Sequence, residues 1–327
     1  MKTKFNSLLQ LTTYFSSKQR CVDHLAQLRW PEGKPVCVHC GSVKCYVCKG
    51  YGKYKCGDCK SRFSITTGTF FENTKLPLNK WFIAMYLCLS RKKGTSSHQL
   101  ARDLGISQKS SWFVLHRIRE LVTEKAPGML FNEGIVEVDE CYIGGKDVNR
   151  HGHKKVRKQN VNDVIEKPSP IIDKHMVVGI IQRGGKVYTE HVHRANLETL
   201  KPLIIQRVDP NVRVITDEHY AYSTLKWTYL HDQVNHSAKV WTIADAHTNT
   251  IENYWSVVKR CVYGTYHQLS GKHLQSYLSE FTFRYDTRTQ SEEQRFLSAL
   301  KRCNGRLKWD QLVSRPTPKS KNWHSEK

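Results

Sequence analysis

The chain has 327 residues, 39% hydrophobic and 25% charged, which describes an ordinary globular protein with room for two or three domains. Its longest apolar run, Trp81–Leu89, is too short to cross a bilayer, and the N-terminal residues lack the apolar core of a secretory signal. The 52 Lys and Arg against 29 Asp and Glu give a net charge of +23, which favours a polyanionic partner, nucleic acid before an anionic membrane.

The first segment, residues 1–33, is expected to be helical. Apolar side chains recur at helical spacing as far as Leu28. The sequence Trp30-Pro-Glu-Gly33 then ends the helical pattern, because Pro and Gly both oppose helix continuation.

Residues 34–75 are expected to form a zinc ribbon, because six of the eleven cysteines cluster there in CxxC pairs. Without a secretory signal, such pairs favour a metal site over disulfides. Two outer pairs have the spacing of a four-cysteine Zn²⁺ site, in which each pair supplies two thiolates to a tetrahedron. The ligands predicted on this spacing are Cys37, Cys40, Cys56 and Cys59. A third pair, Cys45 and Cys48, could replace either outer pair.

Residues 76–126 are expected to contain a helix–turn–helix. The helices are predicted at Trp81–Ser90, Ser96–Leu104 and Gln108–Val122, with a turn at Gly105–Ser107. Side chains of the last helix suit contacts to phosphates and base edges. The DNA-contacting residues predicted here are Gln108, Lys109, Ser110 and Arg117. An ordinary three-helix bundle is the alternative.

The hydrophobic pattern changes at residues 127–290, where strands and helices alternate. The expected order is three strands, a helix, a strand, a short helical piece, a strand and a helix. These elements are predicted at 135–143, 176–182, 186–192, 197–208, 212–216, 219–226, 228–236 and 249–261. This order is that of a ribonuclease-H-like mixed sheet, so the fold class is α/β.

Two basic segments flank this pattern. The loop between the first two strands contains Lys154, Lys155, Arg157 and Lys158, which would contact phosphates or simply form a solvated insertion. Residues 291–327 are expected to hold one more helix and then a basic tail.

Three carboxylates fall at informative places in this predicted sheet. Asp139 lies in the first strand, Asp217 ends the fourth, and Glu252 lies near the start of the last helix. In a ribonuclease-H-like sheet these three places meet at one edge. Two Asp and one Glu can bind two Mg²⁺ ions, which suits displacement at a phosphodiester.

Neighbouring residues complete or compete with this assignment. Lys259 lies two helical turns beyond Glu252 and could meet a DNA phosphate. Glu137, Glu140 and Glu218 are expected to be bystanders, although strand alternation puts Glu137 on the same face as Asp139. Trp255 and Asn249 are also within reach of the site.

Several motifs resemble one known family, the zinc-ribbon insertion-sequence transposases with an ISXO-like catalytic domain, relatives of the Merlin transposons. The resemblance covers residues 10–290. It rests on Arg29-Trp-Pro-Glu-Gly33, Cys37-x2-Cys-Gly41, Phe63–Phe70, Val136-Glu-Val-Asp-Glu140, Tyr142-Ile-Gly-Gly145, Thr216-Asp-Glu-His219, His247–Glu252, Trp255-Ser256, Lys259-Arg260, Tyr263–His267 and Glu280–Tyr285.

The resemblance implies a DDE-type transposase. Such an enzyme binds the terminal inverted repeats of its element, cuts DNA by metal-assisted hydrolysis to free 3′-hydroxyls, and joins them to target DNA. By position, Asp139, Asp217 and Glu252 would bind Mg²⁺ or Mn²⁺, and Lys259 would contact DNA. The third acidic position varies in this family, which leaves Asn249 as a rival to Glu252.

The implied partner is double-stranded DNA, comprising both transposon ends and target. Since two ends must be joined, a homodimer or larger assembly is expected. The expected location is the cytoplasm, on the nucleoid, in a bacterium, or the nucleus in a eukaryote. The alternatives are a sequence-specific DNA-binding regulator that uses only the ribbon and the helix–turn–helix, or an inactive copy.

Overall fold

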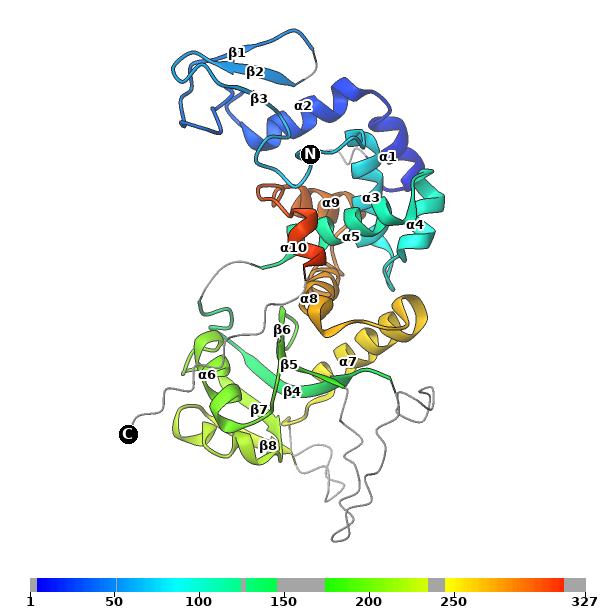
Figure 1. The fold of residues 1–327 in the computed structure, drawn as a ribbon. Helices are drawn as coiled ribbons and strands as arrows, with labels where there is room; N and C mark the ends of the chain where they lie inside the picture. The colour runs from blue at the N-terminus through cyan, green and yellow to red at the C-terminus, as the bar shows by residue number, and fades with distance from the viewer. Residues whose placement is uncertain (1–4, 51, 125–127, 146–173, 235–244, 315–327) are drawn as a thin grey trace, which may run out of the picture.

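The computed structural model describes residues 5–50, 52–124, 128–145, 174–234 and 245–314. The ribbon lies at one end, a helical unit follows, and a mixed sheet with its helices forms the other end (Figure 1). The basic loop with Lys154, Lys155, Arg157 and Lys158, and the tail from residue 315, lie outside the described residues.

The N-terminal segment forms two helices, α1 (Leu8–Tyr14) and α2 (Lys18–Arg29), where one helical stretch was predicted. Phe15 ends α1 with its ring buried, and Ser17 begins α2 by accepting a hydrogen bond from the Arg20 amide. This side-chain cap satisfies an amide that has no partner within the helix.

The ribbon is a three-stranded antiparallel sheet of β1 (Cys45–Val47), β2 (Lys53–Cys56) and β3 (Arg62–Ser64). Tyr54 and Phe63 are buried partners on β2 and β3, and Trp30 at the end of α2 packs against Tyr54. Strands this short bury too little surface to be stable alone, so the ribbon needs a further cross-link.

The predicted helix–turn–helix is present as α4 (Ser97–Leu104) and α5 (Gln108–Val122), preceded by α3 (Leu78–Ser90). Gly105 turns the chain between them with φ +60°, a conformation that glycine adopts without steric cost. Ser107 then begins α5 by accepting a hydrogen bond from the Ser110 amide.

The core of this helical unit is completed from the far end of the chain. Residues 291–314, the part of the C-terminal segment that the structure describes, contain two helices, α9 (Glu292–Leu300) and α10 (Trp309–Val313), rather than the one predicted. Phe296 of α9 packs edge-on against Phe82 and tilted against Phe15 within one hydrophobic cluster. Segments from both ends of the sequence therefore build one core.

The large sheet has the strand order β6-β5-β4-β7-β8. Its strands are β4 (Ile135–Ile143), β5 (His175–Gln182), β6 (Val187–Val192), β7 (Arg213–Asp217) and β8 (His231–Val234). The β6–β5 and β5–β4 pairs are antiparallel, whereas β4–β7 and β7–β8 are parallel. This is the ribonuclease-H-like arrangement that the order of elements predicts.

Helices cover both faces of this sheet. On one face lie α6 (Leu197–Arg207) and the short 3₁₀ turns Tyr220–Tyr222 and Leu225–Trp227. On the other lie α7 (Asn249–Cys261) and α8 (Gly271–Asp286). Among the described residues, no helix has both the length and the apolar composition that crossing a membrane requires.

Helix α8, which the sequence pattern did not predict as an element, closes the edge strand β6. Gln275 donates to the Thr189 carbonyl and accepts from the His191 amide at 3.0 and 2.8 Å. Asp286 accepts from the Val187 amide at 2.9 Å. These side chains form hydrogen bonds with backbone groups of β6 that would otherwise be open to pairing with another chain.

Helix α8 also joins the sheet domain to the helical unit. The Arg119 guanidinium of α5 donates to Glu280 of α8 at 2.7 Å, and both side chains are buried. Arg284 and the Tyr266 hydroxyl donate to the same carboxylate. A buried charge with several donors fixes the two units in one relative orientation, because any displacement would leave a charge unpaired.

Candidate functional site

Two of the predicted carboxylates lie on neighbouring parallel strands. Val138 of β4 pairs with Thr216 of β7, so Asp139 and Asp217 follow in register at the same level of the sheet. Asp217 accepts a hydrogen bond from the His219 amide at 3.0 Å. The convergence expected for a ribonuclease-H-like sheet is thus present for this pair.

Glu140, set aside as a bystander on the sequence, joins this pair. Carboxylate oxygens of Asp139, Glu140 and Asp217 lie within 4.8 Å of one another. Strand alternation turns Glu140 towards the face that carries Tyr222, whose hydroxyl interacts with the Glu140 carboxylate, and the Glu140 Oε1 lies 3.9 Å from the His219 Nδ1. Three carboxylates gathered this closely form a group that a cation would stabilise.

The pKa values of the carboxyl groups in this cluster also favour the binding of a cation. Burial raises the pKa of Asp139 to about 6, and the charges of Asp217 and Glu252 add to the increase. Burial also raises the pKa of Glu140 to about 7, again with contributions from Asp217 and Asp139. Like charges gathered in a poorly hydrated site oppose one another's ionisation, and a divalent cation would remove that opposition.

Glu252 approaches the cluster from the first turn of α7. It lines the same cleft as Asp139 and Glu140, and the Thr248 hydroxyl donates to its Oε1 at 2.8 Å. Its carboxylate does not belong to the 4.8 Å group, although its charge reaches Asp139. Asn249, the alternative at the third position, is exposed and does not line the cleft.

Trp255 supports the cluster through its ring nitrogen. The indole Nε1 donates to the Asp139 Oδ2 at 3.0 Å. The ring lies over β5, where a Cβ at Gly179 would come within 2.6 Å of it. A side chain at that position would displace the indole that donates to Asp139, so glycine is needed there.

Glu137 anchors the helix that carries Glu252. Its fully buried carboxylate accepts from the amides of Thr250 and Ile251 at 2.9 and 3.0 Å, and from the Arg183 guanidinium at 2.7 Å. The carboxylate therefore caps the start of α7, where helix amides lack partners and the helix dipole favours negative charge. All of its oxygens are occupied in this structural role.

We expect Glu137→Gln to lower the free energy of unfolding by about 2–4 kcal/mol. The glutamine side chain leaves Arg183 without its counter-charge, and its NH₂ group would face backbone amides that also donate. Urea-induced unfolding followed by circular dichroism measures this change. The control is Glu133→Gln, an exposed site nearby that should shift stability by less than about 0.5 kcal/mol. Equal stability of both variants would contradict this role of Glu137.

The carboxylates open into a cleft of about 730 Å³ that carries acids at one end and cations at the other. Along α7, Glu252 in the first turn is followed by Lys259 and Arg260 in the last turn. The cleft is lined by Lys93, Asp139, Glu140, Glu252, Trp255, Ser256, Lys259, Arg260, Tyr263 and Gly264. The predicted base Lys259 thus shares the cleft with two of the predicted carboxylates.

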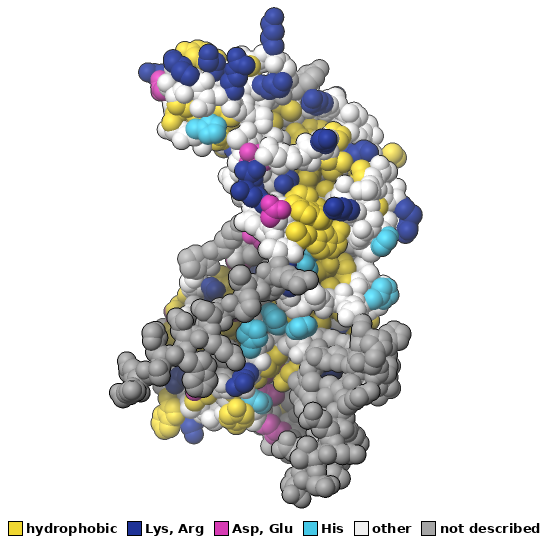
Figure 2. Space-filling model, in the orientation of Figure 1, with side chains coloured by type: hydrophobic (Ala, Val, Ile, Leu, Met, Phe, Trp, Pro, Cys, Tyr) yellow, Lys and Arg dark blue, Asp and Glu magenta, His cyan; other side chains and the backbone are white. Residues whose placement is uncertain are grey.

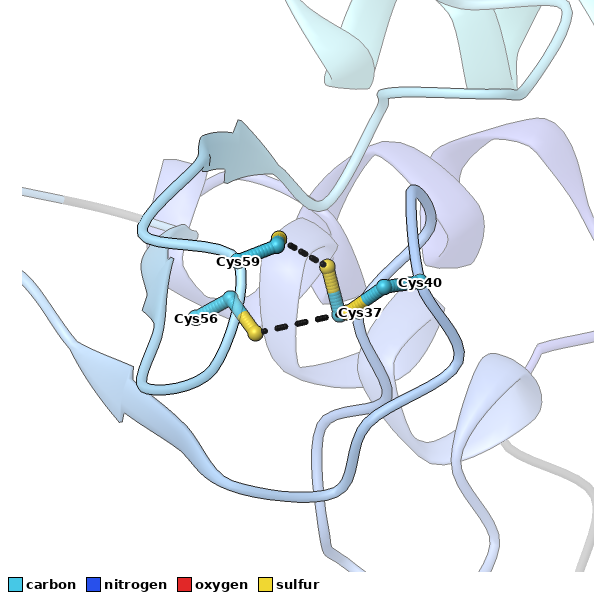
Figure 3. Close-up of side chains that lie close together, drawn as sticks. All are labelled: Cys37, Cys40, Cys56 and Cys59. Carbon is cyan, nitrogen blue, oxygen red and sulfur yellow. Dashed lines mark hydrogen bonds between the residues drawn. The ribbon is translucent and has the colours of Figure 1, made fainter.

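The second candidate metal site is in the ribbon, where the four outer cysteines come together (Figure 3). The sulfurs of Cys37 and Cys59 are 3.7 Å apart, and those of Cys40 and Cys56 are 3.6 Å apart. Four thiolates at about 2.3 Å from a tetrahedral Zn²⁺ would stand about 3.8 Å apart, so the cluster fits the ion.

Hydrogen bonds act differently on the thiols of this site, since contacts with the neighbouring cysteines raise the pKa of Cys40 to about 12. The side chain and backbone of Ser61 lower the pKa of Cys59 to about 6, which favours the thiolate that binds zinc. Cys45 and Cys48, the third pair, lie outside the group of four. Cys45 is nevertheless adjacent to it, since it pairs with Cys56 across β1 and β2.

The residues predicted to contact DNA divide into two sets. Gln108, Lys109 and Ser110 are exposed at the start of α5. Arg117, also predicted to contact DNA, is only 5% exposed, and its guanidinium donates to the carbonyls of Phe70, Glu72 and Leu307 instead. It holds the segment after the ribbon and the C-terminal segment against α5.

A further basic surface, which the sequence analysis did not single out, lies on the ribbon. Lys and Arg side chains gather at that end of the molecule (Figure 2). In β2 and β3 the exposed positions Lys53, Lys55 and Arg62 alternate with the buried Tyr54 and Phe63. Strand alternation was the available signal, since it turns every second residue outward.

Comparison with known proteins gives the same two parts. Residues 132–286 match the ISXO2-like transposase domain, and residues 16–62 match the transposase zinc-ribbon domain. An uncharacterized protein in the transposable element ISH50 of Halobacterium salinarum is 28% identical over 83% of this chain and 91% of its own length. An uncharacterized transposase-like protein of Haemophilus influenzae is 32% identical over 31% of this chain and 81% of its own length.

Solved structures are more distant. The crystal structure of the Mos1 strand transfer complex has a TM-score of 0.27 at 15% identity, covering 68% of this chain and 74% of that one. The Mos1 mariner paired-end complex with Mn has a TM-score of 0.28 at 15% identity, covering 67% and 74%. Similarity this low places no residue of this chain.

Proposed function

We propose that the chain cuts and joins DNA at the ends of its own element. The proposal starts from its family, because the chain belongs to the transposases with a zinc ribbon and an ISXO2-like catalytic domain. It would bind the terminal inverted repeats, hydrolyse the DNA to free 3′-hydroxyls, and join these to target DNA in the same cleft. Residues 127–290 would do the chemistry. Residues 34–75 and 76–126 would bind DNA, while 1–33 and 291–327 support them.

The observation that carries this proposal is the approach of Asp139, Asp217 and Glu252 from two adjacent strands and the facing helix. These residues would bind Mg²⁺ or Mn²⁺, and Glu140 beside them would be a further oxygen ligand. Bound there, such ions activate the attacking hydroxyl and stabilise the leaving oxygen of an in-line displacement.

The chain's own groups then hold the reacting parts. Trp255 orients the carboxylate of Asp139, and Thr248 orients that of Glu252. Lys259 would bind a DNA phosphate beside the carboxylates, where an ammonium offsets the charge of the backbone. Orientation by neighbouring donors matters because small displacements of catalytic groups cost large factors in rate.

DNA recognition would use the exposed start of α5 together with the ribbon. Gln108, Lys109 and Ser110 are available for phosphates and base edges. Lys53, Lys55 and Arg62 add a sequence-independent attraction to the backbone. Because both ends of an element must be brought together, the working form would be a dimer or a larger assembly.

The test is strand cleavage of a labelled duplex that carries the terminal repeat of the element. Wild type should nick the repeat end with Mg²⁺ but not with EDTA, and Asp217→Asn should bind without cutting. Tight binding of the wild type without any cut, under Mg²⁺ and Mn²⁺ alike, would overturn the enzymatic proposal. The chain would then be a binding regulator or an inactive copy.

A further inference from the structure

The loop Arg91–Thr95, which connects α3 to the helix–turn–helix, packs against the catalytic helix α7 (Figure 1). The Lys92 carbonyl accepts from the Cys261 thiol at the end of α7, at 3.7 Å. Gly94 has φ +78°, and a Cβ there would collide with the Tyr266 hydroxyl that follows α7. The loop therefore depends on glycine both for its turn and for its close approach to the catalytic domain.

The loop is also fixed at its own ends. The Gly94 amide donates to the Arg91 carbonyl at 2.9 Å, and Arg91 donates to the buried Thr95 hydroxyl at 3.0 Å. Arg91 additionally pairs with Asp103 of α4 at 3.1 Å. A short turn with these contacts holds the backbone of the residues between in a defined place.

This placement brings Lys93 into the catalytic cleft. Lys93 is exposed and lines the cleft. Its side chain lies beside Gly264, where the Lys93 Cδ would be 3.8 Å from a Cβ placed on that glycine. Its neighbour Lys92 is equally exposed but does not line the cleft. Two adjacent lysines thus differ in position but not in charge.

The cations of the cleft lie in a row that leads away from the carboxylates. Lys259 and Arg260 follow Glu252 along α7, and Lys93 lies beside Gly264, twelve residues after Glu252. At the rise of a helix this separation is about 18 Å. At about 3.4 Å of duplex per nucleotide, a strand cut at the carboxylates would reach Lys93 within about five nucleotides.

We propose that Lys93 is a DNA-binding residue of the catalytic cleft that the helix–turn–helix unit contributes. It would bind a backbone phosphate within about five nucleotides of the cut, and so position the strand for cleavage. The unit that recognises the repeat would thereby also align the strand to be cut. This inference rests on the proposed function, since the bound polyanion is the DNA substrate.

The decisive variants are Lys93→Gln and the matched control Lys92→Gln, which removes the same charge one residue away. In single-turnover cleavage of the repeat duplex at saturating protein, Lys93→Gln should be about tenfold slower, as expected for one charge-assisted contact. Binding of the repeat should change by less than about threefold, because one phosphate contact among several is lost. Lys92→Gln should match wild type, and Lys93→Arg should restore the rate.

Neutral methylphosphonates at single positions test the contact itself. One position within five nucleotides of the cut should slow the wild type but not Lys93→Gln, whereas a merely structural role would leave the pattern of sensitivity unchanged. Equal loss in Lys92→Gln, or an unchanged methylphosphonate pattern in Lys93→Gln, would overturn the proposal.

A binding readout separates this inference from the proposed function. A photo-cross-linking amino acid in place of Lys93 should attach to nucleotides within about five of the repeat end, whether or not the protein cleaves. Absence of a cross-link there, or cross-links spread evenly along the duplex, would refute the contact. If the wild type itself did not cleave the repeat duplex, the enzymatic proposal would be refuted instead.

Discussion

Asp139→Asn should reduce Mg²⁺-dependent cleavage by at least about 1,000-fold while leaving repeat binding within about threefold of wild type. The carboxylate is central to the acidic cluster, since it neighbours Asp217, Glu140 and Glu252. An amide there weakens cation binding and supplies no negative charge, and losing several kcal/mol of metal assistance corresponds to this factor in rate. Single-turnover cleavage and repeat binding, measured on the same duplex, give the two numbers.

The control for this variant is Glu218→Gln, an exposed carboxylate beside Asp217 that is not part of the cluster. Glu218→Gln should cleave at the wild-type rate. It removes one negative charge near the site, as Asp139→Asn does, but it leaves the carboxylates of the cluster unchanged. If Asp139→Asn still cleaved, or if both variants lost activity equally, the assignment of Asp139 would be wrong.

The same substitution should make the metal-free protein more stable at neutral pH. The pKa of Asp139 is raised by burial to about 6, so its ionised form is disfavoured in the folded state. The stability that this raised pKa contributes is complete below the unfolded value near 4 and is lost as the pH rises through about 6. Asp139→Asn removes this loss, so its advantage should appear as the pH rises from 4 to 7.

Thermal unfolding in EDTA across that pH range measures this effect. Glu140, whose pKa is about 7 for the same reason, should leave part of the pH dependence in the variant. Mg²⁺ should stabilise the wild type and not Asp139→Asn, because a ligand stabilises only the state that binds it. A metal-free variant less stable than wild type at pH 7 would contradict the electrostatic account.

The sequence alone predicted the elements that carry strong periodic patterns. The strand 135–143 and the helix 249–261 have the predicted bounds, and the helix carries its buried side chains at helical spacing, at Ile251, Tyr254, Trp255 and Val258. Asp217 at the end of its strand followed from the same reasoning. These local patterns were sufficient to place two carboxylates on adjacent strands once the ribonuclease-H-like order was recognised.

Side chains whose role depends on distant segments could not be assigned in this way. Arg117 looked like a DNA contact because it follows polar residues on a helix, yet segments near Phe70 and Leu307 cover it. Arg119, on the same helix, is likewise covered by α8 and lies 3.7 Å from the centre of the Tyr277 ring. A helix buried on two sides has no exposed face along that length, and nothing local in the sequence states which segments will cover it.

The acidic residues of β4 show the same limit within one strand. Alternation correctly put Glu137 on the face of Asp139, but only the position of α7 reveals that its oxygens are used as a helix cap. Glu140 was expected to be a bystander, yet its carboxylate reaches the cluster near the end of β7. Alternation gives the face of a residue, not the reach of a long side chain.

Removal of zinc should unfold the ribbon and abolish repeat binding, with the catalytic domain left folded. The ribbon's strands contain only three or four residues each. Zinc binding of about 10–16 kcal/mol is the scale of cross-link that so small a sheet needs. We expect Cys56→Ser to lose its zinc, to lose amide protection across residues 34–66, and to weaken repeat binding by at least about 100-fold, if the ribbon contributes several phosphate contacts.

Cys48→Ser is the matched control, because Cys48 is a ribbon cysteine outside the group of four. It should retain one zinc per chain, amide protection and repeat binding, all measured beside Cys56→Ser by metal analysis, hydrogen exchange and a binding assay. The opposite result, zinc lost in Cys48→Ser and kept in Cys56→Ser, would mean that the inner pair provides ligands. The sulfur distances of 3.6 and 3.7 Å favour the outer four, since only sulfurs already near tetrahedral separation bind the ion without refolding the knuckles.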